Sequence, residues 1–109
     1  MKTILFIGFS SMIIVTTPAH CENAKSIFEN KCASCHGQDG KGQTKLGQKL
    51  EIRDLTDPKV QESMKDEEMF KAIKEGIKKD DTTKMKAFGD KLTDEQIKAL
   101  VAYVRSLKK

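Results

Sequence analysis

The sequence predicts one small, all-α domain, and three observations lead to this class. The chain has 109 residues, which suits a single domain. Three stretches repeat apolar residues at helical spacing, whereas no stretch alternates apolar and polar residues for long enough to indicate a strand. The chain has five Phe, one Tyr and no Trp, so its apolar core is thin and we expect a prosthetic group or a cross-link to complete it.

The N-terminal segment, residues 1–21, is typical of a cleaved secretory signal peptide. Lys2 supplies a positive charge, and the apolar run that follows, residues 4–15, is shorter than the roughly 20 residues that a membrane-spanning helix needs. We expect cleavage after Cys21 and a periplasmic product. A cut after Ala19, an uncleaved N-terminal anchor and a lipid on Cys21 are the alternatives, although the residues before Cys21 do not resemble a lipid-attachment sequence.

The mature domain, residues 22–109, begins with a predicted helix over Ala24–Cys32. Its apolar residues share one face, and Asn23 is a suitable N-cap. The segment that follows, residues 37–50, holds four glycines and no helical period, so we expect a long ordered loop there.

Two further helices are predicted in the middle of the chain. The stretch TDPKVQESM starts a short helix at Pro58, capped by Asp57 or Thr56. The stretch DEEMFKAIKEG forms the next helix, with acids at its start and Gly76 at its end. Its apolar stripe consists of Met69, Phe70 and Ile73.

A second loop, residues 77–91, precedes the clearest helix of the chain. Thr93 and Gln96 fit a capping box at the start of that helix. Basic residues at its end suit the helix dipole. Its predicted buried stripe is Ile97, Leu100, Val101 and Val104.

The motif KCASCH places Cys32, Cys35 and His36 close together, and three chemistries compete for it. A redox-active thiol pair accompanies a βαβ pattern, which this chain lacks. A zinc site needs four ligands, typically from two Cys/His pairs, and no second pair follows. Cys-x-x-Cys-His is the attachment signature of c-type haem, because two thiols at this spacing each bond one vinyl group of the same porphyrin. The histidine then lies under the iron, and we favour this third chemistry.

Three segments carry a resemblance to the class I c-type cytochromes, the small bacterial monohaem cytochromes c. FENKCASCHGQDGKG resembles the haem-attachment segment of the family, MKAFGDKLTDEQ its distal-ligand loop, and ALVAYVRSL its last helix. The resemblance implies a small cytochrome c fold whose N- and C-terminal helices cross near-perpendicularly, with one or two short helices and long haem-wrapping loops. It also implies that Ala24 and Phe28 meet Leu100 and Tyr103.

The same resemblance implies one haem c, bound covalently by Cys32 and Cys35, with His36 as the proximal ligand of the iron. Met85 is the expected distal ligand, because it also lies in a long non-periodic loop before a well-capped helix; Met64 and Met69 are the alternatives. Further haem contacts are expected from Gln48, Leu50, Arg53 and Phe88. Of these, Gln48 stands where the family often has proline, and its carbonyl would accept the Nδ1–H of His36. Lys86 also replaces a proline after the ligand methionine.

The expected function is that of a soluble monohaem electron carrier, cycling Fe(III)/Fe(II) between redox partners without turning over a substrate of its own. His/Met ligation closes the iron and favours electron transfer. Two alternatives remain: a haem-based sensor or catalyst with an open sixth position, and a dedicated electron-transfer subunit of an oxidoreductase.

Charge bears on the expected partners. The chain has a formal net charge of +4. The resemblance implies that both loops border the haem edge, where six lysines would steer docking onto acidic redox partners: Lys41, Lys45, Lys49, Lys84, Lys86 and Lys91. We expect a monomer that binds no nucleic acid and makes no stable membrane insertion.

Overall fold

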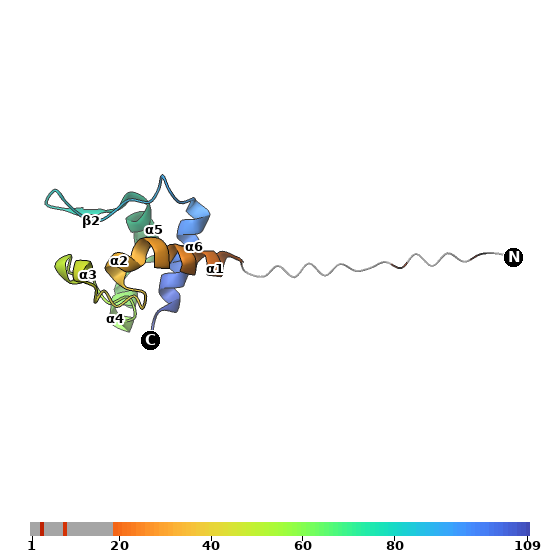
Figure 1. Ribbon diagram of the computed structural model, residues 1–109, viewed down its shortest axis with the longest axis horizontal. Helices are drawn as coiled ribbons and strands as arrows, with labels where there is room; N and C mark the ends of the chain where they lie inside the picture. The colour runs from red at the N-terminus through yellow and green to blue at the C-terminus, as the bar shows by residue number, and fades with distance from the viewer. Residues whose placement is uncertain (1–2, 4–7, 9–18) are drawn as a thin grey trace.

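The computed structural model describes residues 3, 8 and 19–109 (Figure 1). The predicted signal peptide therefore lies largely outside the described residues, and its cleavage site stays a prediction. In the part of the chain that the structure describes, no helix has both the length and the apolar character needed to cross a membrane.

A continuous helical run carries the cysteine motif. It consists of α1 (Ala19–Ile27), the π-helix η1 (Phe28–Cys32) and α2 (Ala33–His36). The prediction that Asn23 caps its start is wrong, because Asn23 lies inside α1. Once a helix is nucleated, each added residue gains one backbone hydrogen bond, and the residues before Asn23 contain no breaker after Pro18. The π-helix is of interest because such segments often occur at functional sites.

Two short helices follow. The predicted glycine-rich loop contains a helix that sequence reasoning missed, α3 (Lys45–Lys49), whose N-cap Thr44 accepts a hydrogen bond from the amide of Gly47. The next helix, α4 (Pro58–Ser63), starts as predicted, with Pro58 in its first turn and the Asp57 carboxylate accepting from the amide of Lys59.

The two longest predicted helices of the second half are also present. Helix α5 (Asp66–Glu75) carries acids in its first turn, ends at Gly76 and buries Met69 and Ile73. Helix α6 (Asp94–Ser106) begins with both hydrogen bonds of the predicted capping box. Its predicted stripe is fully confirmed, since the buried residues of α6 are Ile97, Leu100, Val101 and Val104.

The prediction of an all-α chain is wrong between α5 and α6. Strands β1 (Ile77–Lys79) and β2 (Thr82–Met85) pair as an antiparallel hairpin with a register shift after Ile77. The turn residues Asp80 and Asp81 have φ of 52° and 64°, as a type I′ turn requires. The strands are short and mostly exposed, so they lack the apolar alternation by which a strand is recognised in sequence. The fold is mostly helical, with this small sheet.

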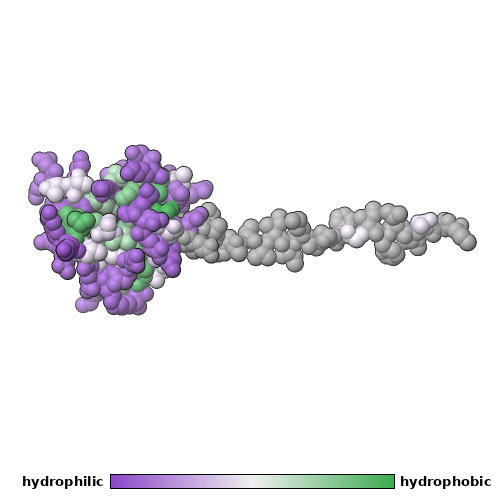
Figure 2. Space-filling model, in the orientation of Figure 1, coloured by the Kyte–Doolittle hydropathy of each residue, from purple (hydrophilic) through white to green (hydrophobic). Residues whose placement is uncertain are grey.

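The core lies where α1 contacts α6 (Figure 1). Phe28, Ile97 and Leu100 are its largest fully buried side chains. The ring centroids of Phe28 and Tyr103 lie 5.2 Å apart, which confirms the predicted contact. The predicted near-perpendicular crossing of the two helices stays a prediction. Hydrophilic residues cover most of the face shown in Figure 2, with small hydrophobic patches between them.

Candidate haem site

A cavity of about 710 Å³ opens between the cysteine motif, α3, α5 and the β1–β2 hairpin. It brings together residues that are far apart in the sequence, including Cys32, Cys35, His36 and Met85. In Figure 1, α3 and the hairpin lie at the same end of the domain, with α2 beside them. The cavity volume falls within the roughly 300–1,000 Å³ that small-molecule and cofactor sites occupy.

The two cysteines of the motif are free and half-buried at the cavity wall. Burial raises the pKa of Cys32 to about 11, and the nearby Cys35 thiol adds to the rise. A nucleophilic redox cysteine needs the opposite, a pKa lowered toward neutrality by cations or a helix N-terminus. The surroundings of Cys32 therefore do not favour a redox-active thiol pair.

The imidazole of His36 also faces the cavity, 6.3 Å from the ring of Phe28 between centroids. Burial lowers the pKa of His36, which favours the neutral form that binds metals. Within the described residues, its Nδ1 is a buried polar atom without a hydrogen-bond partner. An imidazole in this state has both ring nitrogens available to a cofactor and to its supporting groups.

The predicted support for this ring from Gln48 is not formed in the structure. Gln48 does not line the cavity. Its carbonyl accepts from the amide of Glu51 at 3.2 Å, and the carbonyl of Gly47 accepts from the amide of Ile52 at 2.9 Å. These two bonds make a Schellman motif at the end of α3, with Glu51 at a φ of 56°. The helix that sequence reasoning missed thus engages the Gln48 carbonyl in its own capping.

The loop before α3 holds the end of α2 instead. The hydroxyl of Thr44 donates to the carbonyl of Cys35 at 2.8 Å, and the amide of Gly42 donates to the carbonyl of His36 at 2.7 Å. At Gly47 a Cβ would lie 2.5 Å from the Cys35 carbonyl oxygen, so only glycine allows α3 to come this close. These contacts partner the last carbonyls of a helix, which have no partners inside it.

All three methionines that were weighed as the distal ligand line the cavity: Met64, Met69 and Met85. Met69 also belongs to the core, as its position on the stripe of α5 predicts. Met64 lies at the end of α4, and the Arg105 guanidinium donates to its backbone carbonyl. Met85 ends β2 and is half-buried. The cavity alone does not choose among them.

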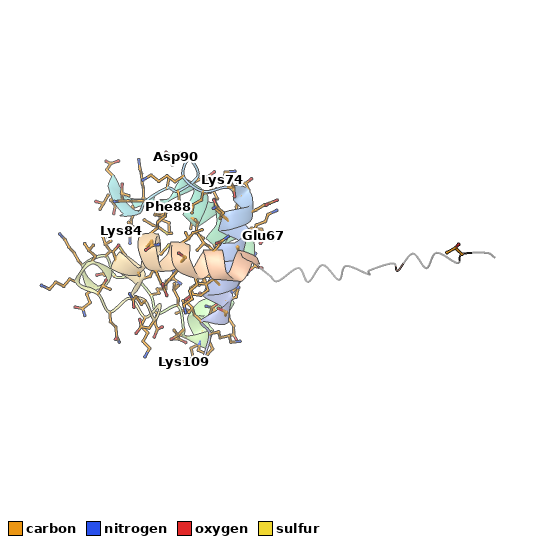
Figure 3. The ribbon with its side chains drawn as sticks, turned by 45° about the vertical axis from the view of Figure 1, so that its right-hand side comes forward. Glu67, Lys74, Lys84, Phe88, Asp90 and Lys109 are labelled. Carbon is orange, nitrogen blue, oxygen red and sulfur yellow. The ribbon has the colours of Figure 1, made fainter. Side chains whose placement is uncertain are left out.

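Among the other predicted contacts, Leu50, Arg53 and Phe88 line the cavity. The Arg53 guanidinium lies 3.3 Å from the hydroxyl of Ser63, to which it donates. In Figure 3, Phe88 and Lys84 lie on the hairpin side of the domain, away from Lys109.

Sequence reasoning missed several lining residues, among them Leu46 of α3 and Ile77 of β1, which are 48% and 45% exposed. Both residues were missed because they lie on α3 and on the hairpin, and neither element was predicted. The six loop lysines divide: Lys84 and Lys86 line the cavity, and Lys41, Lys45, Lys49 and Lys91 do not. Lys31 lines it in addition.

These residues fit a covalently attached haem. Two free thiols and a half-buried imidazole with a lowered pKa line the cavity, and thioethers lie among its other lining residues. Thiolate or thioether sulfur and imidazole nitrogen are the axial donors that haem iron takes in proteins. Apolar side chains such as Leu50, Ile52 and Phe88 line the remainder, as a flat apolar cofactor requires.

Comparisons with known proteins agree with this fit. The model of the family described as cytochrome c oxidase, cbb3-type, subunit III matches residues 19–104. A cbb3-type cytochrome c oxidase subunit, FixPc, from Rhizobium leguminosarum bv. viciae is 29% identical over 93 residues, which are 83% of this chain. The chain covers only 29% of the length of that relative.

A solved structure is also similar. The KustC0563 c-type cytochrome superimposes with a TM-score of 0.70 and 37% sequence identity, covering 79% of this chain and 98% of the other. A c-type cytochrome implies covalently bound haem c. Of the three chemistries considered for the Cys-x-x-Cys-His motif, haem attachment is therefore the one supported, rather than a thiol pair or a zinc site. The chain belongs to the cytochrome c family of cbb3-type oxidase subunit III, and it is a small c-type cytochrome with a role in electron transfer.

Proposed function

We propose that this protein is a single-haem electron carrier in which His36 and Met85 are the axial ligands of the iron. The observation that carries the proposal is the cavity wall shared by Cys32, Cys35 and His36, with Met85 also lining the cavity. The haem, when bound, supplies an iron that accepts and releases one electron. Two protein ligands close the iron and favour electron transfer over ligand chemistry.

The chain's own residues have distinct parts in this proposal. Cys32 and Cys35 hold the cofactor by thioether bonds, which keep it in place in a small domain. Thr44 and Gly42 fix the backbone that presents His36. Phe88 lies in the loop after Met85 and helps to exclude water from the cavity. The low polarity that results stabilises the less charged, reduced state of the site.

The remaining parts of the proposal concern the protein as a whole. We propose that it is exported to the periplasm by the signal peptide, acts there as a soluble monomer and turns over no substrate of its own. The order of a positive charge, a short apolar run and small residues in residues 1–21 supports export. A haem sensor or catalyst would instead leave the sixth iron position open. The methionines that line the cavity favour an iron whose sixth position is occupied by the protein.

A second candidate function is that of a dedicated electron-transfer subunit of an oxidoreductase. The matching family is described as subunit III of a cbb3-type cytochrome c oxidase, and the relative FixPc is named as a subunit of a cbb3-type cytochrome c oxidase. The chain covers 29% of the length of that relative. We therefore propose membership of a larger assembly only as the second candidate. Size-exclusion chromatography of detergent-solubilised and soluble fractions separates a free monomer from a subunit.

The proposed partners are redox proteins with acidic docking surfaces. Lys31, Lys84 and Lys86 line the cavity, and Arg53 adds a fourth cation. Glu51 and Glu68 also line it, so the lining is positive on balance rather than uniformly basic. Such a surface raises the rate of association with an acidic partner, and added salt lowers that rate.

Absorption spectra of the purified, exported protein test the proposal. We expect one covalent haem per chain, a low-spin six-coordinate iron in both oxidation states, and a reversible one-electron titration. A resting high-spin iron that binds carbon monoxide or peroxide without any variant would support the sensor or catalyst instead. A purified protein without covalent haem would contradict both the electron carrier and the sensor or catalyst.

A further inference from the structure

We propose that Gly76 is a positioning residue for Met85, and this inference rests on the proposed role of Met85 as the distal ligand. Gly76 is the residue at which α5 ends. Because it has no side chain, the end of α5 contacts the backbone of Met85, Lys86 and Ala87 directly. The end of α5 thereby fixes the position of the Met85 backbone, from which the side chain reaches the cavity.

The close contact is visible in what a side chain would meet at this position. A Cβ on Gly76 would lie 2.6 Å from the carbonyl oxygen of Met85, 2.9 Å from the amide nitrogen of Ala87 and 3.1 Å from the carbonyl carbon of Lys86. All three are backbone atoms, which cannot rotate away as the end of a flexible side chain can. A larger residue at position 76 must therefore move the Met85 segment.

Two backbone hydrogen bonds also connect the same segment to α5. The amide of Phe88 donates to the carbonyl of Ile73 at 2.9 Å, and the amide of Gly89 donates to the carbonyl of Lys74 at 3.0 Å. Both carbonyls belong to the last turn of α5, which has no partners for them within the helix. A Cβ on Gly89 would lie 2.8 Å from the Lys74 carbonyl oxygen, so this contact also needs glycine.

The segment from Met85 to Gly89 thus serves as the cap of α5. The ordinary reason for glycine here is its backbone conformation, with φ 77° and ψ 178°, which is essentially confined to glycine. This conformation explains why position 76 holds glycine, but it does not explain the close contacts of Gly76 with the backbone of Met85, Lys86 and Ala87. Gly40, which also has a positive φ, separates the two effects because its Cβ would meet other atoms.

Binding of imidazole to the oxidised holoprotein measures how firmly Met85 holds the iron, because imidazole must displace it. We expect Gly76→Ala to raise imidazole affinity about tenfold and to lower the reduction potential, since methionine ligation raises that potential. A role of Gly76 in backbone conformation alone predicts instead that Gly76→Ala loses stability but binds imidazole as the wild type does.

Gly40→Ala is the matched control. Gly40 has a φ of 78°, and a Cβ there would meet Cδ1 of Leu107 at 2.8 Å, away from the Met85 segment. This variant should lose stability while imidazole affinity stays within twofold of wild type. An equal rise in Gly40→Ala, or no rise in a folded Gly76→Ala, overturns the proposal.

Met85→Ala separates this inference from the proposed function. If Met85→Ala raises imidazole affinity and Gly76→Ala does not, the role of Gly76 fails alone; if Met85→Ala changes nothing, the ligand assignment and this inference fail together. Hydrogen exchange on the wild-type holoprotein needs no variant. The amides of Phe88 and Gly89 should exchange far more slowly than that of Asp81 at the hairpin turn, and equal exchange would show that α5 does not hold the segment.

Discussion

The ring of Phe28 lies 5.2 Å from that of Tyr103 and 6.3 Å from that of His36, measured between centroids. Phe28 is 2% exposed. It therefore connects the helix that carries the cysteine motif to α6 and contacts the wall of the haem cavity at the same time. The core of the domain and the haem site share this side chain.

Phe28→Ala should consequently weaken both. We expect a loss of about 3–5 kcal/mol in the free energy of unfolding, because a buried aromatic ring leaves a cavity. Chemical denaturation of the holoprotein measures it. Tyr103→Phe is the control: it keeps the ring against Phe28 and should change stability by less than about 0.5 kcal/mol. A Phe28→Ala variant as stable as wild type would show that the haem alone organises this end of the core.

Glu51 occupies a backbone conformation that usually belongs to glycine. Its φ is 56°, and it follows α3 at the position where a Schellman motif favours glycine. Glu51→Gly should stabilise the protein by about 1 kcal/mol, since left-handed backbone costs a residue with a Cβ about 1–2 kcal/mol and glycine loses part of that gain in the unfolded chain. Thermal unfolding checks the direction, and an unchanged or lowered Tm would contradict it.

The parts of the fold that were predicted correctly have strong local signals. The capping box of Thr93 and Gln96, and Pro58 after Asp57, each fix a helix start by chemistry within four residues. The hairpin gave no such signal, because Asp80 and Asp81 adopt positive φ without a glycine.

The candidate site was predictable to the extent that it follows from one motif. Cys32, Cys35 and His36 are adjacent in sequence, and their common wall needs only a turn of helix. The support of His36 was not predictable, because it depends on α3: the helix engages the Gln48 carbonyl and places Thr44 on Cys35. Helix α3 has five residues and one glycine, so it is stable only in its packed context.

Thr44 connects α3 to the cysteine motif, and its hydroxyl both donates to the Cys35 carbonyl and accepts from the Gly47 amide, each at 2.8 Å. Thr44→Val removes both bonds while keeping the shape. We expect a loss of about 1–2 kcal/mol in stability. Thr44→Ser keeps the hydroxyl and should recover most of it. Urea unfolding compares the two variants with the wild type, and a Thr44→Val protein as stable as the wild type would show that the hydroxyl contributes nothing.

The pH dependence of stability should carry a contribution from Asp54. The Asp54 carboxylate accepts two hydrogen bonds from Thr56, one from its hydroxyl at 2.6 Å and one from its amide at 2.8 Å. These bonds hold the pKa of Asp54 below its usual 3.8. A carboxylate with a lowered pKa stabilises the fold above its unfolded pKa, and this contribution disappears as the pH falls through the folded value.

Asp54→Asn, which keeps an acceptor but does not titrate, should therefore be less stable than wild type at neutral pH. The difference in Tm should shrink as the pH falls below about 3.8, the ordinary pKa of the group. A difference that stays constant through this window would show that Asp54 has the same pKa in the folded and unfolded chains.

The three methionines that line the cavity give the sharpest test of the proposed iron ligation. Met69 is 8% exposed and packs in the core, so its thioether has a structural role without the iron. Met64 is tied through its carbonyl to Arg105. Met85 lies on the segment that α5 holds through Gly76, Ile73 and Lys74, and its half-buried side chain packs at the edge of the core.

Met85→Ala should open the sixth position of the iron. We expect a partly high-spin oxidised spectrum, rapid uptake of carbon monoxide by the reduced protein and a lower reduction potential, because a methionine ligand raises it. Met69→Ala should keep the low-spin spectrum and lose about 2–5 kcal/mol of stability as a buried methionine does, and Met64→Ala should lose less because Met64 is only half-buried. Absorption spectra and denaturation of the three variants, taken side by side, decide the matter. A low-spin Met85→Ala protein beside a high-spin Met64→Ala or Met69→Ala protein would move the ligand to the other methionine, because only loss of the ligand itself changes the spin state while the fold persists.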